Sequence, residues 1–183
     1  MTDELKELCP IQFIEGVNEN LTHTTPDWDV GFPADDPSAS FFAMEGKQWA
    51  IQFVPGMAYT ITDVEVLGKS DQKAAAKKHD VAVYIDNGGA PGYNRVTTGE
   101  LVVQAENDGG YWANAQLKPL VVFPKYKYWL VFEEESIKLM LARGKKGSGA
   151  AVSYTSGKPG QWAAPVQGTL FLKFHGRVMP VVS

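Results

Sequence analysis

The chain carries few residues that could perform acid–base, nucleophilic or metal chemistry. Its 183 residues include three histidines and one cysteine, Cys9, and no two histidines stand at the spacing of a zinc site. The patterns HExxH, GxSxG and GxxxxGK[ST] are absent from the sequence. The run 133–135 of three glutamates ends an expected strand and is typical of a solvated edge, and we expect His175 to face solvent. We therefore predict a non-enzymatic protein.

Aromatic side chains near expected loops offer a different chemistry, the stacking of planar rings on the apolar faces of sugars. The alternative to this interpretation is that the rings plug the end of a β-fold. The candidate carbohydrate-binding residues are Tyr93, Tyr111, Trp112, Tyr154 and Trp162.

Calcium is a minor alternative that we do not favour. Asp86, Asn87 and Asp108 stand at expected turns, and calcium takes six to eight oxygen ligands, many of them from loops. No D-x-D-x-D-G spacing is present, so Asx turns are the favoured interpretation. We predict no cofactor and no metal site.

Charge is divided unevenly along the chain. The formal net charge is −4, yet residues 1–36 carry nine acidic side chains and one lysine, so the rest of the chain is basic. An acidic segment before a basic body predicts docking on a basic surface, its own or a neighbour's. The candidate docking residues are Asp27, Trp28, Asp29, Asp35 and Asp36.

Other partners are disfavoured by the same patterns. The overall charge gives no case for nucleic acid, and aromatics do not interleave with the dense basic cluster Lys69–Lys78. No apolar run approaches the roughly 18 residues of a membrane span. The start MTDELKELCP lacks the apolar region of a secretory signal, which predicts synthesis in the cytoplasm.

Strands must position these residues. From residue 38 the chain consists of short apolar or alternating runs separated by turn residues, which predicts a single all-β domain over 38–183 after an irregular arm over 1–37. Only Ser70–Lys78 favours a helix, as an insert between strands. Tyr126–Phe132 is apolar on both faces, so it is either a central strand covered on both sides, which we favour, or a subunit contact. Asn87–Gly92 predicts two successive tight turns.

The order of elements resembles a known pattern. Val83–Asp86 followed by Gly88–Gly92, and later Tyr128–Val131, are similar to segments of the jelly-roll-like β-sandwich modules of extracellular and virion proteins, including the choice-of-anchor type. The resemblance covers about 70% of the chain, and its motifs are turns and core positions. It implies an antiparallel, jelly-roll-like β-sandwich that binds, adheres or builds a surface without catalysis.

These observations lead to one functional expectation and one alternative. A surface-type sandwich without an export signal suits a virus particle, so we expect a virion component, such as a phage capsid decoration protein or a tail or fibre protein. It would be made in the host cytoplasm and dock through its arm on capsid or tail proteins or on its own copies, as a homo-oligomer. The alternative is an extracellular carbohydrate-binding module of a secreted protein, with a glycan as ligand.

Overall fold

The computed structural model describes residues 40–44, 46–56, 58–70, 73, 75–105, 110–143 and 150–178. Over these ranges the chain forms eleven strands and no helix, which confirms the all-β prediction. Within the same ranges we find no helix that is long and apolar enough to cross a membrane. The strands are β1 (Ser40–Ala43), β2 (Gln48–Phe53), β3 (Tyr59–Ser70), β4 (Lys77–Asn87), β5 (Ala90–Val103), β6 (Tyr111–Val122), β7 (Tyr128–Phe132), β8 (Leu139–Arg143), β9 (Ala150–Gly157), β10 (Val166–Leu170) and β11 (Leu172–Val178).

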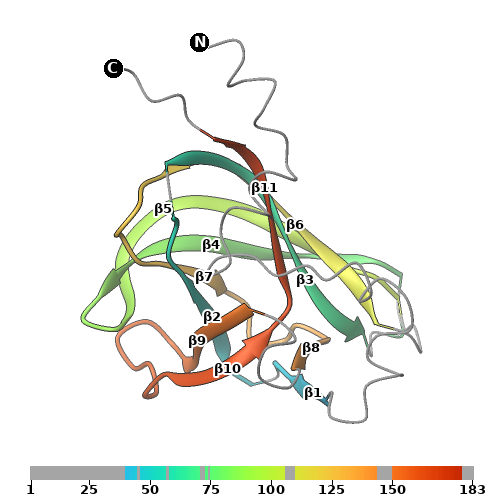
Figure 1. The fold of residues 1–183 in the computed structure, drawn as a ribbon. Coiled ribbons are helices and arrows are strands. Elements are labelled where there is room, and N and C mark those ends of the chain that lie inside the picture. The colour runs from blue at the N-terminus through green and yellow to red at the C-terminus, as the bar shows by residue number, and fades with distance from the viewer. Residues whose placement is uncertain are drawn as a thin grey trace.

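All strands of the described ranges belong to one antiparallel sheet in the order β1-β8-β10-β9-β2-β7-β4-β5-β6-β3-β11 (Figure 1). The sheet nearly closes on itself because Phe171 alone separates β10, which pairs with β9, from β11, which pairs with β3. A second contact between β8 and β3 reinforces the closure. The result is barrel-like. The division into two packed sheets that a jelly-roll sandwich requires stays a prediction.

Alternation along each strand fills the interior of the barrel-like sheet. Val81 and Val83 of β4 and Leu101 and Val103 of β5 point into a large apolar core, while the residues between them face outward. The alternating run around Val81 and Val83 in the sequence therefore belongs to a strand with one inward face. The longest strands, β4, β5, β6 and β3, curve across the back of the molecule in Figure 1.

β7 is buried along its whole length, which confirms the favoured interpretation of a strand covered on both sides for Tyr128–Phe132. Tyr126, at the start of the predicted run, is 59% exposed. The odd-numbered residues of β7, Trp129 and Val131, form an apolar cluster with Ala50 on the outer face of the sheet. The other residues of β7 join the interior core. The loop 158–165 between β9 and β10 covers this cluster with Trp162. Ala163 holds the loop in place, since its N–H donates to the carbonyl of Ser156 at 2.9 Å.

Two local predictions were wrong. Gly88 and Gly89 do form a tight turn, with φ of 66° and 94°, and such positive values match the twist of a two-residue hairpin. The expected second turn is absent, because β5 already begins at Ala90 and pairs with β4 there. The expected helix in Ser70–Lys78 does not form in the described part of that segment, where β3 ends at Ser70 and β4 begins at Lys77.

Candidate functional site

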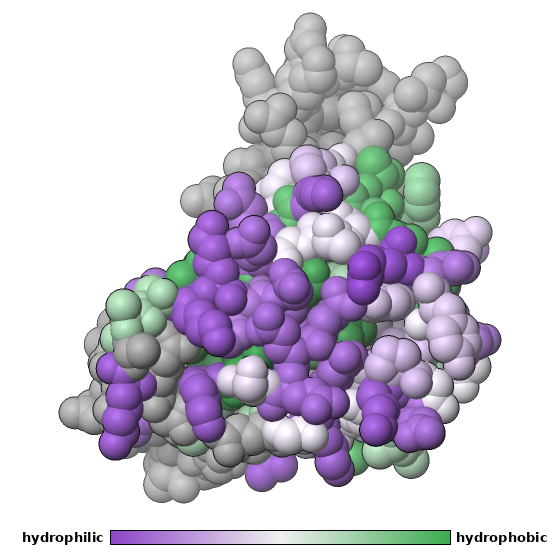
Figure 2. Space-filling view, turned by 180° about the vertical axis from the view of Figure 1, so that it is seen from behind, coloured by the Kyte–Doolittle hydropathy of each residue, from purple (hydrophilic) through white to green (hydrophobic). Residues whose placement is uncertain are grey.

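A row of polar side chains crosses the outer face of five neighbouring strands. The pairing register places Asp80 of β4 opposite Glu100 of β5, Glu100 opposite Gln116 of β6, Gln116 opposite Asp63 of β3, and Asp63 opposite His175 of β11. Most of these residues lie between inward-facing neighbours, so the face is polar because the strands alternate. Asp63 is an exception, since Thr62 beside it is exposed where the β3–β6 register shifts. Seen from behind, the molecule shows a broad hydrophilic surface (Figure 2).

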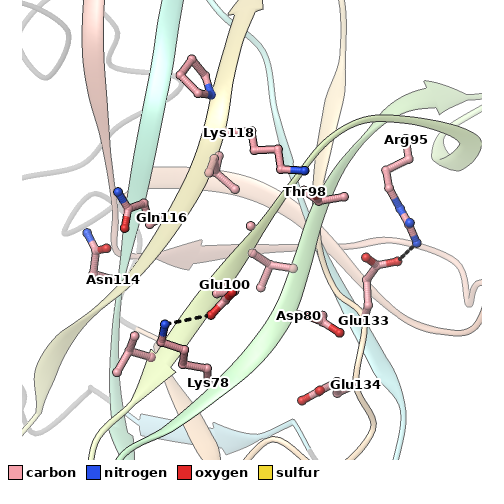
Figure 3. Close-up of a pocket in the computed structure, with 15 residues that line it drawn as sticks. Lys78, Asp80, Arg95, Thr98, Glu100, Asn114, Gln116, Lys118, Glu133 and Glu134 are labelled. Atoms are coloured by element: carbon pink, nitrogen blue, oxygen red, sulfur yellow. Dashed lines mark hydrogen bonds and ion pairs between the residues drawn. The ribbon is translucent and has the colours of Figure 1, made fainter.

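Part of this face is hollowed into an open groove of about 850 Å³. Its walls come from β4, β5 and β6 and from the segment after β7, which contributes Glu133 and Glu134. Figure 3 shows Asn114 and Gln116 on one margin of the groove and Asp80, Glu133 and Glu134 on the other. Lys118 lies between these two margins, toward the top of the view. The groove is concave and lined by polar side chains, and we take it as the candidate site.

One wall of the groove is a rigid network around Glu133. The Tyr84 hydroxyl donates to Glu133 Oε2 at 2.8 Å, and Arg95 Nη2 lies 2.5 Å from the same oxygen. Arg95 Nε also donates to the Tyr84 hydroxyl at 3.2 Å. Burial raises the pKa of Tyr84 above its ordinary value, and the hydrogen bond to Glu133 raises it further. The phenol therefore keeps its proton, and Glu133 is committed to this network.

Three other ionisable side chains of the groove also have partners. Lys78 Nζ lies 3.2 Å from Glu100 Oε2, and both side chains are more than half exposed, so the pair contributes little to stability. Glu134 pairs with Nδ1 of His79. His79 faces the barrel interior, where its side chain is 1% exposed and its Nε2 has no hydrogen-bond partner among the described residues.

Four groove side chains remain uncommitted in the ranges that the structure describes. Their hydrogen-bonding groups are a carboxylate, a hydroxyl, an amide and an ammonium, and the two charges cancel. Such a set can donate hydrogen bonds to, and accept them from, a neutral ligand rich in hydroxyl groups, because each hydroxyl group is both a donor and an acceptor. The four are Asp80, Thr98, Gln116 and Lys118.

The structure does not gather the five predicted carbohydrate-binding aromatics on one platform. Tyr154 lies in the interior core, 7% exposed, with its ring 6.2 Å from that of Trp49. Tyr111 packs against the same core, and its hydroxyl accepts a hydrogen bond from the N–H of Gln104. Three of the five, Tyr93, Trp112 and Trp162, therefore stay outside the interior.

These three rings occupy different surroundings. Trp112 packs on Leu67 and Phe171, and the Lys173 ammonium lies 4.3 Å from its ring centroid. Trp162 packs on the outer cluster around Trp129. Tyr93 is 74% exposed, so its ring is the one most open to a ligand.

Asp86 has a structural role that the calcium alternative did not anticipate. Its carboxylate accepts hydrogen bonds from Trp129 Nε1 at 2.7 Å and from the N–H of Gly89 at 3.2 Å. The second bond closes the β4–β5 turn, although it reaches three residues along the chain and not the two of an Asx turn. No group of three or more potential metal ligands occurs in the described residues. Asp108 lies outside them.

Two further predictions concern His175 and the N-terminal arm. His175 lies on the outer face of β11, but its side chain is largely shielded from solvent. Its Nε2 lies 2.8 Å from Glu65 Oε2 and its side chain is 14% exposed, because β11 packs beside β3 at the sheet closure. The predicted arm and its candidate docking residues Asp27, Trp28, Asp29, Asp35 and Asp36 lie outside the described residues.

Sequence reasoning missed the groove because its walls come from separate strands. The signal that was available is the outward alternation of Asn114, Gln116 and Lys118. Comparison with the models of known protein families and with curated proteins gives no match for this chain.

Proposed function

We propose that the protein is a non-enzymatic, adhesive β-module whose outer groove binds a neutral glycan. The observation that carries the proposal is the composition of the groove. Lys78 pairs with Glu100 and Arg95 pairs with Glu133, while one carboxylate, one hydroxyl, one amide and one ammonium group stay available. Sugar hydroxyls both donate and accept, so they suit this mixed set better than a strongly charged ligand would. The open shape suits a ligand that enters from the side.

A binding experiment tests this proposal. The protein is applied to a printed array of neutral oligosaccharides, and the glycan with the strongest signal is titrated by calorimetry. We expect Gln116→Ala to weaken binding by roughly tenfold, since a hydrogen bond contributes about 0.5–1.5 kcal/mol net and a tenfold change corresponds to about 1.4 kcal/mol.

Gln167→Ala is the matched control for this experiment. Gln167 is an exposed glutamine on β10, does not line the groove, and bonds only to Ser153 among the contacts described. Its substitution removes the same side-chain atoms and should leave affinity unchanged. Absence of binding to every glycan on the array, or equal effects of the two substitutions, would contradict the proposal.

The jelly-roll-like architecture belongs to the same proposal. We infer a flattened barrel, with β1, β8, β10, β9, β2 and β7 in one layer and β4, β5, β6, β3 and β11 in the other. The strand order along the sheet supports this division, and the groove then lies on the outer face of the second layer. The resemblance to extracellular and virion modules is compatible with an adhesive role.

A place in a virus particle is the second candidate, favoured by the separation of charge along the chain. Residues 1–36 are strongly acidic, while the described body carries exposed lysines at positions 73, 77 and 78. We propose that the arm docks on a basic surface of a capsid or tail protein or of another copy, giving a homo-oligomer.

Deletion of residues 1–36 tests the docking proposal. We expect the truncated protein to unfold at the same denaturant concentration as the full chain but to lose self-association, as measured by light scattering at low salt. The full chain should dissociate as salt is raised, because charge pairs at exposed surfaces are screened. An unchanged molar mass after truncation would refute docking between copies of the chain.

A further inference from the structure

A second pocket lies at the β4–β5 hairpin. It encloses about 330 Å³ and is lined by Ile85, Asp86, Asn87, Gly92, Tyr93 and Asn94. Tyr93 is the most exposed large hydrophobic residue found in the described ranges, at 74%. An exposed ring beside a polar pocket is a combination that suits one face of a sugar and its hydroxyl groups.

The hairpin holds this pocket in a defined shape. The turn at Gly88 and Gly89 is closed by the Asp86 carboxylate, which Trp129 fixes from the buried strand β7. At Gly92 the two strands approach so closely that a Cβ atom there would lie 2.8 Å from the carbonyl oxygen of Ile85. The backbone beside Tyr93 is therefore set by packing, so that binding orders few additional groups.

The neighbouring loop reaches the edge of the Tyr93 ring. A Cβ atom at Gly160 would lie 3.0 Å from the Tyr93 hydroxyl. The ring thus has one edge beside the loop 158–165 and keeps most of its surface open. Asn87 and Asn94 also line the pocket; both are exposed, and their side-chain amides form no hydrogen bond in the described part of the structure.

The hairpin pocket and the groove are consecutive along β5. Tyr93 and Asn94 line the pocket, and the next residue, Arg95, lines the groove. The groove then continues along the same strand to Val102. At about 3.3 Å for each residue, the stretch from Tyr93 to Val102 spans roughly 30 Å, which is far longer than one sugar ring.

We propose that the groove and the hairpin pocket are successive subsites for one extended oligosaccharide chain, with Tyr93 as the stacking platform at one end. The inference rests on the proposed glycan-binding function and specifies its ligand as a chain of several sugar units. Units in the groove bond to Gln116 and Thr98, and a terminal unit stacks on Tyr93 and bonds to the amides of Asn87 and Asn94.

A chain-length series tests the proposal. The probes are the β-1,4-linked and α-1,4-linked glucose oligomers from disaccharide to hexasaccharide and the matching xylose and N-acetylglucosamine series, titrated by calorimetry into the full chain. For the series that binds, we expect affinity to rise with each added unit until the chain spans both pockets. Tyr93→Ala should lower hexasaccharide affinity by about tenfold and leave disaccharide affinity unchanged.

Two further variants complete the test. Tyr93→Phe keeps the ring and should retain hexasaccharide affinity, while Gln116→Ala should weaken short and long ligands alike. Because Tyr93 is largely exposed, its substitutions leave the fold intact, which thermal unfolding checks. Equal affinity for disaccharide and hexasaccharide, or wild-type binding by Tyr93→Ala, overturns the extended site and leaves the groove function standing. Failure of every series to bind overturns both.

Discussion

Trp129→Ala is expected to lower the free energy of unfolding by about 3–5 kcal/mol, as large aromatic truncations in cores do. The Trp129 side chain lies on the outer face of β7, where Trp162 of the loop 158–165 packs against its cluster, and it is fully buried. Its loss leaves a cavity under Trp162 and also removes the N–H that donates to Asp86 at 2.7 Å. The midpoint and slope of urea unfolding, followed by circular dichroism, measure the change.

Trp129→Phe separates packing from hydrogen bonding at this site. Phenylalanine fills much of the same space but leaves the Asp86 carboxylate without its indole donor, which should cost about 1–3 kcal/mol. The Ala variant must therefore be the less stable of the two. If both variants unfold at the same urea concentration as the native protein, the outer cluster is not a second core.

Gly176→Ala is expected to destabilise the sheet closure by about 3 kcal/mol or more, at the upper end of overpacking costs. Gly176 lies in β11 at the point where its pairing with β3 shifts register. A Cβ atom there would lie 1.7 Å from the carbonyl oxygen of Thr60, and backbone cannot yield as a flexible side chain can. Unfolding in urea gives the loss of stability.

Gly88→Ala is the matched control for this substitution. No atom lies within 4 Å of a Cβ placed at Gly88, but its φ is 66°. The cost there is limited to the left-handed conformation, about 1 kcal/mol. Comparable losses in the two variants would show that β11 is not clamped against β3 as the structure has it.

Much of the fold could be predicted because it depends on local signals. Alternating apolar residues in 79–86 mark a strand and its inward face, and Asn87-Gly88-Gly89 predicted a tight turn, which joins β4 to β5. The alternation of Leu170, Leu172 and Phe174 does not reveal that Phe171 divides it between β10 and β11. β6 is a single strand over Tyr111–Val122, although it contains a proline. Pro119 interrupts the pattern, yet it lies where the β3–β6 register shifts, so its missing N–H is tolerated within one strand.

Less of the candidate site could be predicted. Tyr93 was identified as a binding candidate and its ring is exposed, but the other four rings were grouped only by their nearness to turns. His175 was expected in solvent, since the sequence does not reveal that Glu65 of β3 lies beside it. The inward position of His79 was not predicted. It follows from the alternation of a strand, because His79 stands two residues before Val81 and shares its inward face.

By itself the sequence determined the class of secondary structure, the tight turn at Gly88 and the two apolar faces of β7, because each depends on residues close together in the chain. Only the tertiary structure decided that the strands form one nearly closed sheet, that the loop 158–165 covers Trp129, and that Asp80, Gln116 and Glu133 meet in one groove. The physical reason is that those contacts join residues far apart in sequence, and their positions follow from strand order and register, which local periodicity does not encode.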